Sequence, residues 1–285
     1  MGQCLGRKSA VTGPFSSLAG PPTSVLVEPG HCVFSEDWSS AKLISRVQQG
    51  ASSQLCTFEL SDQSKPLGLS TCACILAKGP EHDGTPVVRP YTPISTNALV
   101  GQFELLVKVY PDGKMSQHLA TLPLGQPVDF KHIEFNVKIQ YPFNNAKKIG
   151  ILCGGTGVAP MIQALHAILG TPGDTSQVSM LYGSVKESDV LAKDTLDSWV
   201  ASSGGRFSVS HVLSQEPTES AWTGARGFID ESLIKANLPS PSDDCLIFVC
   251  GPPPMYDTLC GPRTEKELTG VLAGMGFKPE QVYKF

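Results

Sequence analysis

The sequence has no apolar run that approaches the roughly 18 residues a helix needs to cross a membrane. It also has no excess of positive charge, because 22 Lys and Arg residues stand against 26 Asp and Glu, for a formal net charge of −4. Such a balance gives no general attraction for nucleic acid. No internal repeat is visible, and the six histidines lack the spacing of a metal site. Membrane-spanning, nucleic-acid-binding, repeat and metal-centred proteins are therefore disfavoured.

A disulfide framework is missing as well. The nine cysteines are odd in number and scattered, which favours a reducing intracellular compartment. Cys72-Ala-Cys74 is the only close pair, and it lies in an apolar run without a matching Cys or His pair. We therefore expect buried strand thiols at this place and no zinc site.

The N-terminal 35 residues differ in composition from the rest of the chain. The first 27 contain Arg7 and Lys8, no acidic residue, and several Ser, Pro and Gly. We expect this segment to lie outside the packed core, either as a targeting segment or as a flexible tail. Cys4 could accept a palmitate and hold the protein at a membrane surface. The cytoplasmic surface of a membrane and the mitochondrion both remain open as locations.

The remaining 250 residues are enough for two cores, and their patterns differ. Residues 36–143 show short runs rich in β-formers at 42–47, 54–60 and 103–110, separated by Gly-Pro and Asp-Gly turns. This pattern predicts a small antiparallel β-barrel.

Residues 144–285 alternate between apolar strands and helical segments. Helix 158–169 has its apolar residues at helical spacing, which predicts one stripe facing the core. The alternation predicts a Rossmann-like parallel sheet with helices on both faces. The predicted strands are 149–153, 178–182, 207–213 and 246–250, and the other predicted helices are 189–200 and 229–237, the last capped by Asp230.

Four segments carry residue types suited to dinucleotides. Arg89-Pro-Tyr-Thr-Pro-Ile-Ser95 ends a strand, and its arginine fork suits a phosphate. Gly113-Lys-Met-Ser116 and Gly154-Gly-Thr-Gly-Val-Ala-Pro160 each place glycine at the start of a helix, where backbone amides attract an anion. Cys250-Gly-Pro-Pro-Pro-Met255 places a thiol at the carboxyl end of a parallel strand, the side on which such sheets bind ligands.

In these segments the chain resembles the NADH–cytochrome b5 reductase family, within the wider ferredoxin-reductase-like flavoenzymes, from about Ser35 to Phe285. The resemblance implies FAD in the barrel domain and NADH in the α/β domain. It implies an oxidoreductase that takes hydride from NADH and passes single electrons to cytochrome b5 or a similar haem protein. We expect a monomer that binds no nucleic acid.

The resemblance also implies the residues that hold the flavin. Arg89 would pair with a cofactor phosphate, Tyr91 would lie against the isoalloxazine ring, and Thr92 would hydrogen-bond near N5 and relay a proton there. The expected FAD-binding residues are Arg89, Pro90, Tyr91, Thr92, Leu106, Lys108, Tyr110, Gly113, Lys114, Met115, Ser116 and Thr156.

On the nicotinamide side, Cys250 would pack by the ring and help to align the hydride donor, and Phe285 is the candidate for an aromatic ring beside it. Thr156 would reach toward both cofactors, so the expected catalytic residues are Thr92, Thr156 and Cys250. The expected NAD-side residues are Gly154, Gly155, Gly157, Ser214, Cys250, Gly251, Pro252, Met255 and Phe285.

Each segment also has an ordinary structural interpretation. Arg89 and Tyr91 could belong to a plain strand end, and Ser116 could be a simple helix N-cap. The chain also departs from the family at three places: Cys72-Ala-Cys74 replaces a Gly-Gln-His, Lys131-His-Ile133 replaces a Lys/Arg-Gly-Pro, and Ala159 replaces a frequent Thr. The first two departures bear on acceptor docking and cofactor affinity.

The nucleotide preference depends on one position. In the family an Asp in a Leu-Asp-x-x-Pro pattern repels the 2′-phosphate of NADPH, whereas this chain has Ser214 there. No Arg or Lys occurs between Phe207 and Glu219 to hold that phosphate, and Glu216 keeps a negative charge close. We therefore expect NADH to be preferred, with weaker discrimination against NADPH than in the family.

Two further functions remain open from the sequence. The acceptor could be a quinone or an iron–sulfur protein, or the chain could be a flavin-binding redox sensor without turnover that uses its cysteines. For a haem acceptor, the lysines within 131–148 form a basic excess that could steer an acidic partner, or simply a solvated strand and linker. These lysines are Lys131, Lys138, Lys147 and Lys148.

Overall fold

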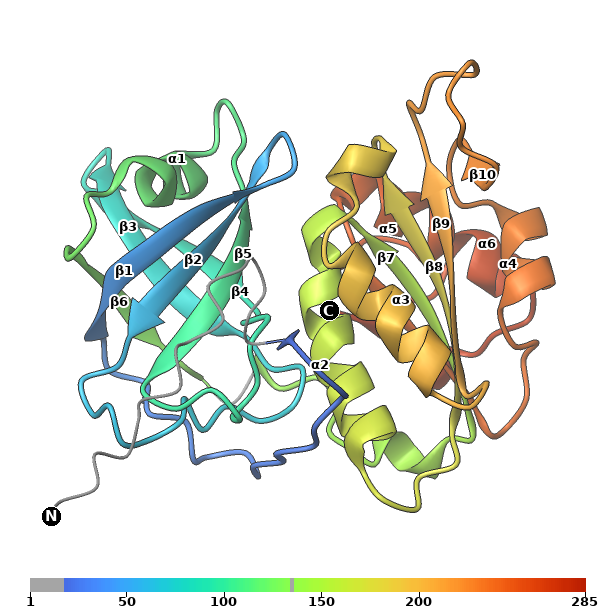
Figure 1. The fold of residues 1–285 in the computed structure, drawn as a ribbon, viewed down its shortest axis with the longest axis horizontal. Coiled ribbons are helices and arrows are strands. Elements are labelled where there is room, and N and C mark those ends of the chain that lie inside the picture. The colour runs from blue at the N-terminus through green and yellow to red at the C-terminus, as the bar shows by residue number, and fades with distance from the viewer. Residues whose placement is uncertain (1–17, 134–135) are drawn as a thin grey trace, which may run out of the picture.

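We analysed a computed structural model of the chain, which describes residues 18–133 and 136–285. Each half of the chain forms its own six-stranded sheet, one antiparallel and one parallel, as the sequence predicts. Figure 1 shows the two halves lying side by side, with helix α2 (Val158–Gly170) between them. The boundary between the two folds is therefore the expected place of the cofactor site.

The N-terminal half is an antiparallel barrel-like sheet with strand order β4-β3-β6-β1-β2-β5. Its centre is a cluster of four buried rings, Phe34, Phe58, Phe103 and Phe130, with centroids 5.0–5.6 Å apart. Helix α1 (Lys114–Thr121) packs on β3, β4 and β5. The strands are β1 (Ser39–Gln49), β2 (Ser53–Glu59), β3 (Ile75–His82), β4 (Thr85–Tyr91), β5 (Gln102–Lys108) and β6 (Pro127–Lys131).

The C-terminal half is a parallel sheet with strand order β10-β9-β8-β7-β11-β12. Its strands are β7 (Lys148–Gly154), β8 (Gln177–Ser184), β9 (Phe207–Leu213), β10 (Ala225–Arg226), β11 (Cys245–Cys250) and β12 (Val282–Lys284). Alternation along β11 decides which face each side chain joins: Leu246 and Phe248 pack toward α2, and Ile247 and Val249 pack on the opposite face. Both faces are buried, so the strand is apolar throughout.

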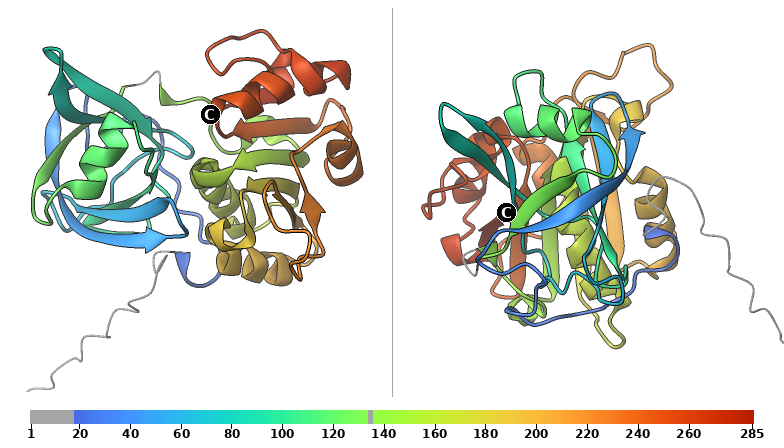
Figure 2. Two further views of the ribbon diagram at one scale, coloured as in Figure 1. Left: turned by 90° about the horizontal axis from the view of Figure 1, so that it is seen from above. Right: turned by 90° about the vertical axis from the view of Figure 1, so that its left-hand side faces the viewer.

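Helices cover both faces of this sheet, as predicted. Helices α2 and α3 (Lys193–Ser202) lie on one face, whereas α4 (Glu231–Asn237), α5 (Pro253–Leu259) and α6 (Gly270–Gly274) lie on the other (Figure 2, left). Asp230 caps α4, because its Oδ1 accepts the Leu233 N–H at 2.8 Å. The helix predicted at 189–200 is wrong at its start: a short 3₁₀ turn at Glu187–Asp189 and Ala192 in the left-handed region (φ 54°) precede α3.

Helix α2 is buried on all sides, which the single predicted stripe did not anticipate. The reason is its position, because the barrel covers the face that the sheet does not. Gln163 shows this contact: its Oε1 accepts the Cys72 N–H at 2.7 Å, and its Nε2 donates to the Pro93 carbonyl at 2.7 Å. Helix α2 is thereby held against the barrel at its middle.

The N-terminal segment from Leu18 onward also joins the two halves. Leu18 is buried in the core of the α/β half, although the sequence predicts the first 27 residues to lie outside the core. The Gly20 carbonyl accepts the Trp199 indole N–H at 3.0 Å, and the Thr23 N–H donates to His166 Nδ1 at 2.9 Å. The targeting or flexible character predicted for residues 1–17 concerns a part of the chain outside the described residues.

The same segment continues onto the barrel. Asn97 donates from Nδ2 to the Val25 carbonyl at 3.3 Å, and the Val33 N–H donates to the Leu67 carbonyl at 2.8 Å. Residues 18–34 therefore form a strap that is hydrogen-bonded first to the α/β half and then to the barrel.

We expect acid to weaken the strap through His166. Burial lowers the pKa of His166 to about 4, below the ~6.5 of an unfolded histidine. The stabilisation is therefore present above pH ~6.5 and is lost as pH falls toward 4, by up to roughly 3 kcal/mol. Urea unfolding at pH 7 and pH 4.5 should show a smaller acid loss for His166→Asn than for the parent chain. An equal loss in both would place the acid sensitivity elsewhere, for example at His118 or His211, whose pKa values are also lowered by burial.

Candidate active site

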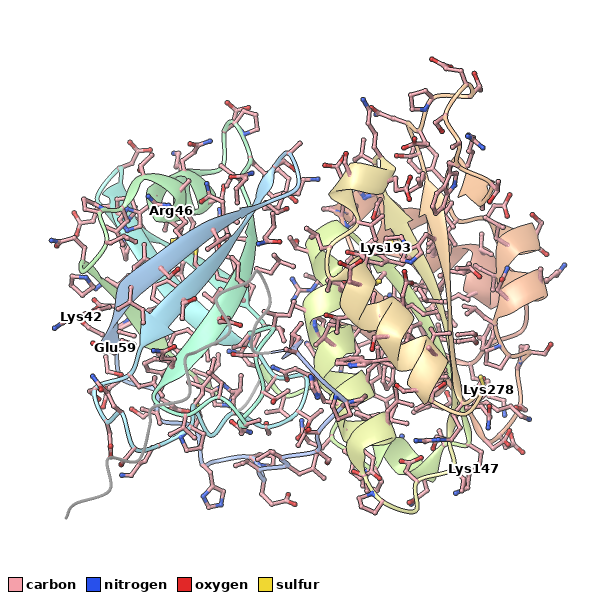
Figure 3. All side chains as sticks on the ribbon, in the orientation of Figure 1. Lys42, Arg46, Glu59, Lys147, Lys193 and Lys278 are labelled. Atoms are coloured by element: carbon pink, nitrogen blue, oxygen red, sulfur yellow. The ribbon has the colours of Figure 1, made fainter. Side chains whose placement is uncertain are left out.

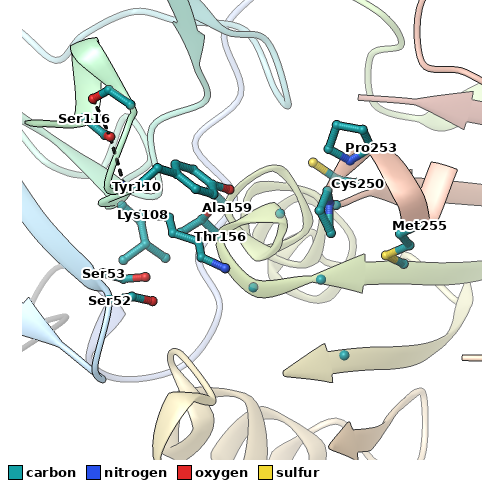
Figure 4. A pocket seen from close by; sticks show the side chains of 18 of the residues that line it. Ser52, Ser53, Lys108, Tyr110, Ser116, Thr156, Ala159, Cys250, Pro253 and Met255 are labelled. Carbon is teal, nitrogen blue, oxygen red and sulfur yellow. Dashed lines mark hydrogen bonds between the residues drawn. The ribbon is translucent and has the colours of Figure 1, made fainter. Parts of the chain in front are cut away.

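One cleft of about 1290 Å³ opens between the barrel and the carboxyl ends of the parallel strands. Every residue that the sequence predicts for either cofactor lines this cleft. Figure 4 shows Lys108, Tyr110 and Ser116 on the barrel side, Cys250, Pro253 and Met255 on the other side, and Thr156 between them. Segments up to 196 residues apart, from Arg89 to Phe285, thus meet at one place.

The barrel contributes the ends of β4 and β5 to the cleft. Arg89 is exposed near the end of β4, and its guanidinium donates only a local hydrogen bond to the Val88 carbonyl at 2.8 Å. Tyr91 lies half-buried beside it, and burial raises the pKa of its phenol, so the ring stays neutral. On β5, Lys108 places its ammonium 5.4 Å from the centre of the Tyr110 ring. This wall combines a cation for a phosphate with aromatic surface for a flat ring.

Ser116 shapes the turn before α1 and does not cap the helix. The N-cap residue is Gly113, with no side-chain cap. The Ser116 hydroxyl accepts the Tyr110 N–H at 3.1 Å and donates to the Gly113 carbonyl at 3.0 Å. A Cβ at Gly113 would come within 2.4 Å of that hydroxyl, so the turn requires glycine. The alternative of a simple Ser116 cap is therefore wrong.

The glycine turn between β7 and α2 is held from two sides. Gly155 adopts a positive φ of 53°, and its carbonyl accepts the Tyr182 hydroxyl at 3.0 Å. Gly157 packs against the end of β11 so closely that a Cβ there would lie 2.2 Å from the Cys250 carbonyl oxygen. The N-terminus of α2 faces the cleft at Gly154–Gly157, and the dipole of a helix start favours an anion there.

Cys250 lies half-buried at the carboxyl end of β11 and is fixed by the C-terminus. Phe285 N–H donates to the Val249 carbonyl at 3.0 Å, and the Tyr256 hydroxyl donates to the Phe285 carbonyl oxygen. Burial raises the pKa of the Cys250 thiol, with smaller opposite effects from Tyr256 and Arg263. The group is thus a neutral thiol at pH 7, suited to packing and alignment and not to nucleophilic attack.

The structure adds lining residues that the sequence analysis missed. The β1–β2 hairpin reaches across the cleft, and its Ala51 N–H donates to Asp189 Oδ1 at 3.2 Å. Phe228 is 81% exposed and lines the nucleotide side. No local pattern indicates the hairpin residues, because a contact between distant segments brings them to the cleft. Cys74 had a signal in the unusual Cys72-Ala-Cys74 pair, and it lines the barrel wall of the cleft.

The basic residues of 131–148 do not form one patch at the cleft. Lys147 and Lys148 lie at the start of β7, at the end of the parallel sheet away from the cleft (Lys147 in Figure 3), and Lys148 pairs with Asp244 at 3.4 Å. The seven residues of β7 separate them from the cleft by about 20 Å. Lys131 instead lies over the Trp38 ring at 4.9 Å. Lys147 and Lys148 therefore do not belong to a steering surface at the cleft, and steering by Lys131 and Lys138 stays a prediction.

The cleft fits two dinucleotides. Its volume exceeds the range of roughly 300–1000 Å³ that is usual for one small ligand, and on each side it has a glycine turn at the start of a helix, a place suited to an anion, at Gly113–Ser116 and Gly154–Gly157. A Cβ would not fit at Gly113 or at Gly157, whereas at Gly155 the space around a Cβ is open.

Fold and cleft together define a two-domain FAD- and NAD-dependent oxidoreductase. Two family models match, the oxidoreductase FAD-binding domain over residues 40–137 and the oxidoreductase NAD-binding domain over residues 151–261. The chain is 37% identical over 277 residues to NADH-cytochrome b5 reductase 2 of Aspergillus clavatus, covering 94% of this chain and 84% of the relative. It is 38% identical over 255 residues to the protein of that name from Yarrowia lipolytica, covering 88% and 86%. The chain belongs to the NADH–cytochrome b5 reductase family.

Solved structures agree on the fold. The cytochrome b5 reductase domain of Ulva prolifera nitrate reductase is similar with a TM-score of 0.73 and 26% identity, covering 90% of this chain and 97% of that one. The CS-b5R domains of human Ncb5or are similar with a TM-score of 0.71 and 24% identity, covering 86% and 68%. The same two-domain arrangement therefore recurs at low sequence identity.

Proposed function

We propose that the chain oxidises NADH through bound FAD and passes the electrons singly to cytochrome b5 or a similar haem protein. The observation that carries the proposal is the single cleft in which all the predicted flavin and nicotinamide residues meet. The relatives named NADH-cytochrome b5 reductase 2 support the donor and the acceptor. FAD and NADH are thus the expected cofactor and substrate.

Each wall of the cleft has a distinct task in this proposal. When bound, the flavin accepts hydride from the nicotinamide and can release its electrons one at a time. Arg89 and the Gly113–Ser116 turn would hold the FAD phosphates, and Thr92 would hold a proton near the ring. The α2 N-terminus would bind the nucleotide phosphates, while Thr156 and Cys250 would orient the nicotinamide. Phe285 would exclude water from that side.

The acceptor is tested by steady-state assays on the FAD-loaded protein. NADH should support fast reduction of cytochrome b5 and of ferricyanide, a small acceptor that needs no docking surface. If the enzyme reduces ferricyanide but does not reduce cytochrome b5, its acceptor is a different molecule. A quinone and a ferredoxin are the next acceptors to test. No NADH oxidation with any acceptor would overturn the proposal.

The cysteines in the described ranges do not support the alternative of a redox sensor without turnover. Each of the eight cysteines in the described ranges has its pKa raised, and burial is the largest cause at every one. Sensor thiols need the opposite, a lowered pKa and exposure. Anaerobic NADH should therefore bleach the flavin colour, and added acceptor should restore it repeatedly.

Replacing Arg89 with Ala should weaken FAD binding by about 10- to 100-fold, because one charge-assisted contact contributes roughly 1.5–3 kcal/mol. The matched control is Arg226→Ala, an exposed arginine of the other domain outside this wall. Titration of apoprotein with FAD, followed by flavin fluorescence, gives both affinities. Equal losses in the two variants would remove Arg89 from the cofactor site.

A peripheral membrane association through the N-terminus remains a proposal, since residues 1–17 lie outside the described residues. Within the described part of the chain, no helix is long and apolar enough to cross a bilayer. Sedimentation of the full chain with and without palmitoylation at Cys4, in the presence of vesicles, tests the association directly. We also propose that the enzyme is a monomer, and the same samples without vesicles report its mass.

A further inference from the structure

Ser214 brings no charge to the corner of the cleft that it lines. Ser214 follows β9, and both its N–H and its hydroxyl donate to the Ser184 carbonyl, at 3.0 and 3.3 Å. The hydroxyl is therefore turned toward the end of the neighbouring strand β8. At the position where the family carries a repelling carboxylate, this chain presents a neutral wall that lines the cleft.

Arg226 stands next to this corner, although it is twelve residues away in sequence. Strand β10 pairs in parallel with β9 and sets Arg226 opposite Leu213, the residue before Ser214. Gly227 N–H donates to the Leu213 carbonyl at 2.9 Å, and Gly227 itself lines the cleft. The guanidinium donates to the Pro217 carbonyl at 3.2 Å and to Ser220 Oγ at 3.1 Å, both through Nη2. Arg226 is thus a positioned cation next in sequence to the cleft-lining Gly227.

A second cation comes from the end of β8. The Gln215 N–H donates to the Val185 carbonyl at 2.8 Å, which brings Lys186, the next residue, beside the same loop. No Lys or Arg occurs in the window of residues 207–219. Arg226 and Lys186 both lie outside that window. Arg226 belongs to β10 and Lys186 follows β8, the two strands that flank β9.

The nearby carboxylate is already engaged. Glu216 Oε2 accepts the Glu187 N–H at 2.9 Å. That hydrogen bond is the largest cause of the lowered pKa of Glu216, and Arg226 and Lys186 lower it further. Three other acidic residues lie in this region, Glu187, Glu219 and Asp189. Glu219 accepts a hydrogen bond from the Thr218 hydroxyl at 3.2 Å, and Asp189 accepts one from the Ala51 N–H. Arg226 and Lys186 therefore both lie close enough to act on the charge of Glu216.

We propose that Arg226 and Lys186 form a subsite for the 2′-phosphate of a 2′-phosphorylated adenine nucleotide, so that the enzyme oxidises NADPH as well as NADH. A guanidinium and an ammonium are the groups that bind phosphate best, and a neutral Ser214 removes the repulsion. The phosphate takes no part in hydride transfer and leaves unchanged on NADP⁺. The inference rests on the proposed function only in its choice of donor site.

The test uses nucleotide fragments, so that it needs neither an acceptor nor turnover. Calorimetry of the oxidised, FAD-loaded protein should show 2′,5′-ADP binding about tenfold more tightly than 5′-AMP, as one extra charge-assisted contact would give. R226Q should abolish most of this advantage and leave 5′-AMP binding unchanged. The matched control is K235Q, which removes a cation from α4 outside the cleft, where Lys235 pairs with Glu231. It should leave both affinities unchanged.

Because Arg226 also holds the loop at Pro217–Ser220, K186Q provides a second variant without that contact, and it should reduce the advantage of 2′,5′-ADP in the same direction. Equal binding of 2′,5′-ADP and 5′-AMP to the parent protein would overturn the inference, as would an advantage that survives in both R226Q and K186Q. Ser214→Asp should weaken 2′,5′-ADP and spare 5′-AMP. A failure to reduce cytochrome b5 would overturn the proposed function alone, because these affinities do not depend on the acceptor.

Discussion

Replacing Cys250 with Ala should slow the reduction of bound FAD by NADH about 100-fold and change NAD⁺ affinity less than about threefold. Cys250 lies at the end of β11, where its backbone packs against Gly157 of the α2 turn and the preceding Val249 carbonyl accepts the Phe285 N–H. A group that only aligns the donor acts on the transition state more than on the bound ground state, so the rate and the affinity should separate. Stopped-flow reduction under single-turnover conditions measures the rate.

The matched control is Cys245→Ala at the other end of the same strand, where the thiol is packed in the core away from the cleft. That variant should lose stability but keep its reduction rate. Because burial raises the pKa of Cys250, its thiol stays protonated well above neutral pH, and the parent rate should not titrate with this group between pH 6 and 8. A Cys250→Ala rate equal to that of Cys245→Ala would assign Cys250 to packing.

The convergence of the predicted residues on one cleft could be foreseen from the sequence better than the packing around that cleft. Strand ends and helix starts are local patterns, and in a parallel sheet the carboxyl ends of strands meet at one edge, so Gly154–Gly157 and Cys250 had to converge. The barrel motif at Arg89 could be placed at the same cleft only through the family resemblance. Nothing in its own residues indicates which domain edge it faces.

What the sequence could not predict depends on contacts between distant segments. Helix α2 is buried all round because the barrel covers it through Gln163, and a single-helix pattern contains no information about that partner. The strap that begins at Leu18 has the Pro, Gly and Ser content of a tail, yet its ordering rests on hydrogen bonds to His166 and Trp199. Arg226 reaches the nucleotide corner through strand pairing alone.

Among substitutions that add a single methyl group to the active site, Gly157→Ala should cause the largest loss of stability and activity. The added Cβ would lie 2.2 Å from the Cys250 carbonyl oxygen and 2.6 Å from its carbon, and both are backbone atoms that no rotamer change can move. The α2 turn and the end of β11 must separate, which should cost about 3 kcal/mol, or a fall in Tm of roughly 6–12 °C.

The same separation displaces Cys250 and the amides at the start of α2 together, so flavin reduction should fall at least as far as in Cys250→Ala. Gly274→Ala is the control, since a Cβ on that α6 glycine meets no atom within 4 Å and a helical alanine is favourable. Melting curves and single-turnover reduction should leave Gly274→Ala at or above the parent values. If Gly157→Ala melts and reacts like Gly274→Ala, the close packing of the two strand ends does not set the geometry of the site, because the turn would then have room to move without loss.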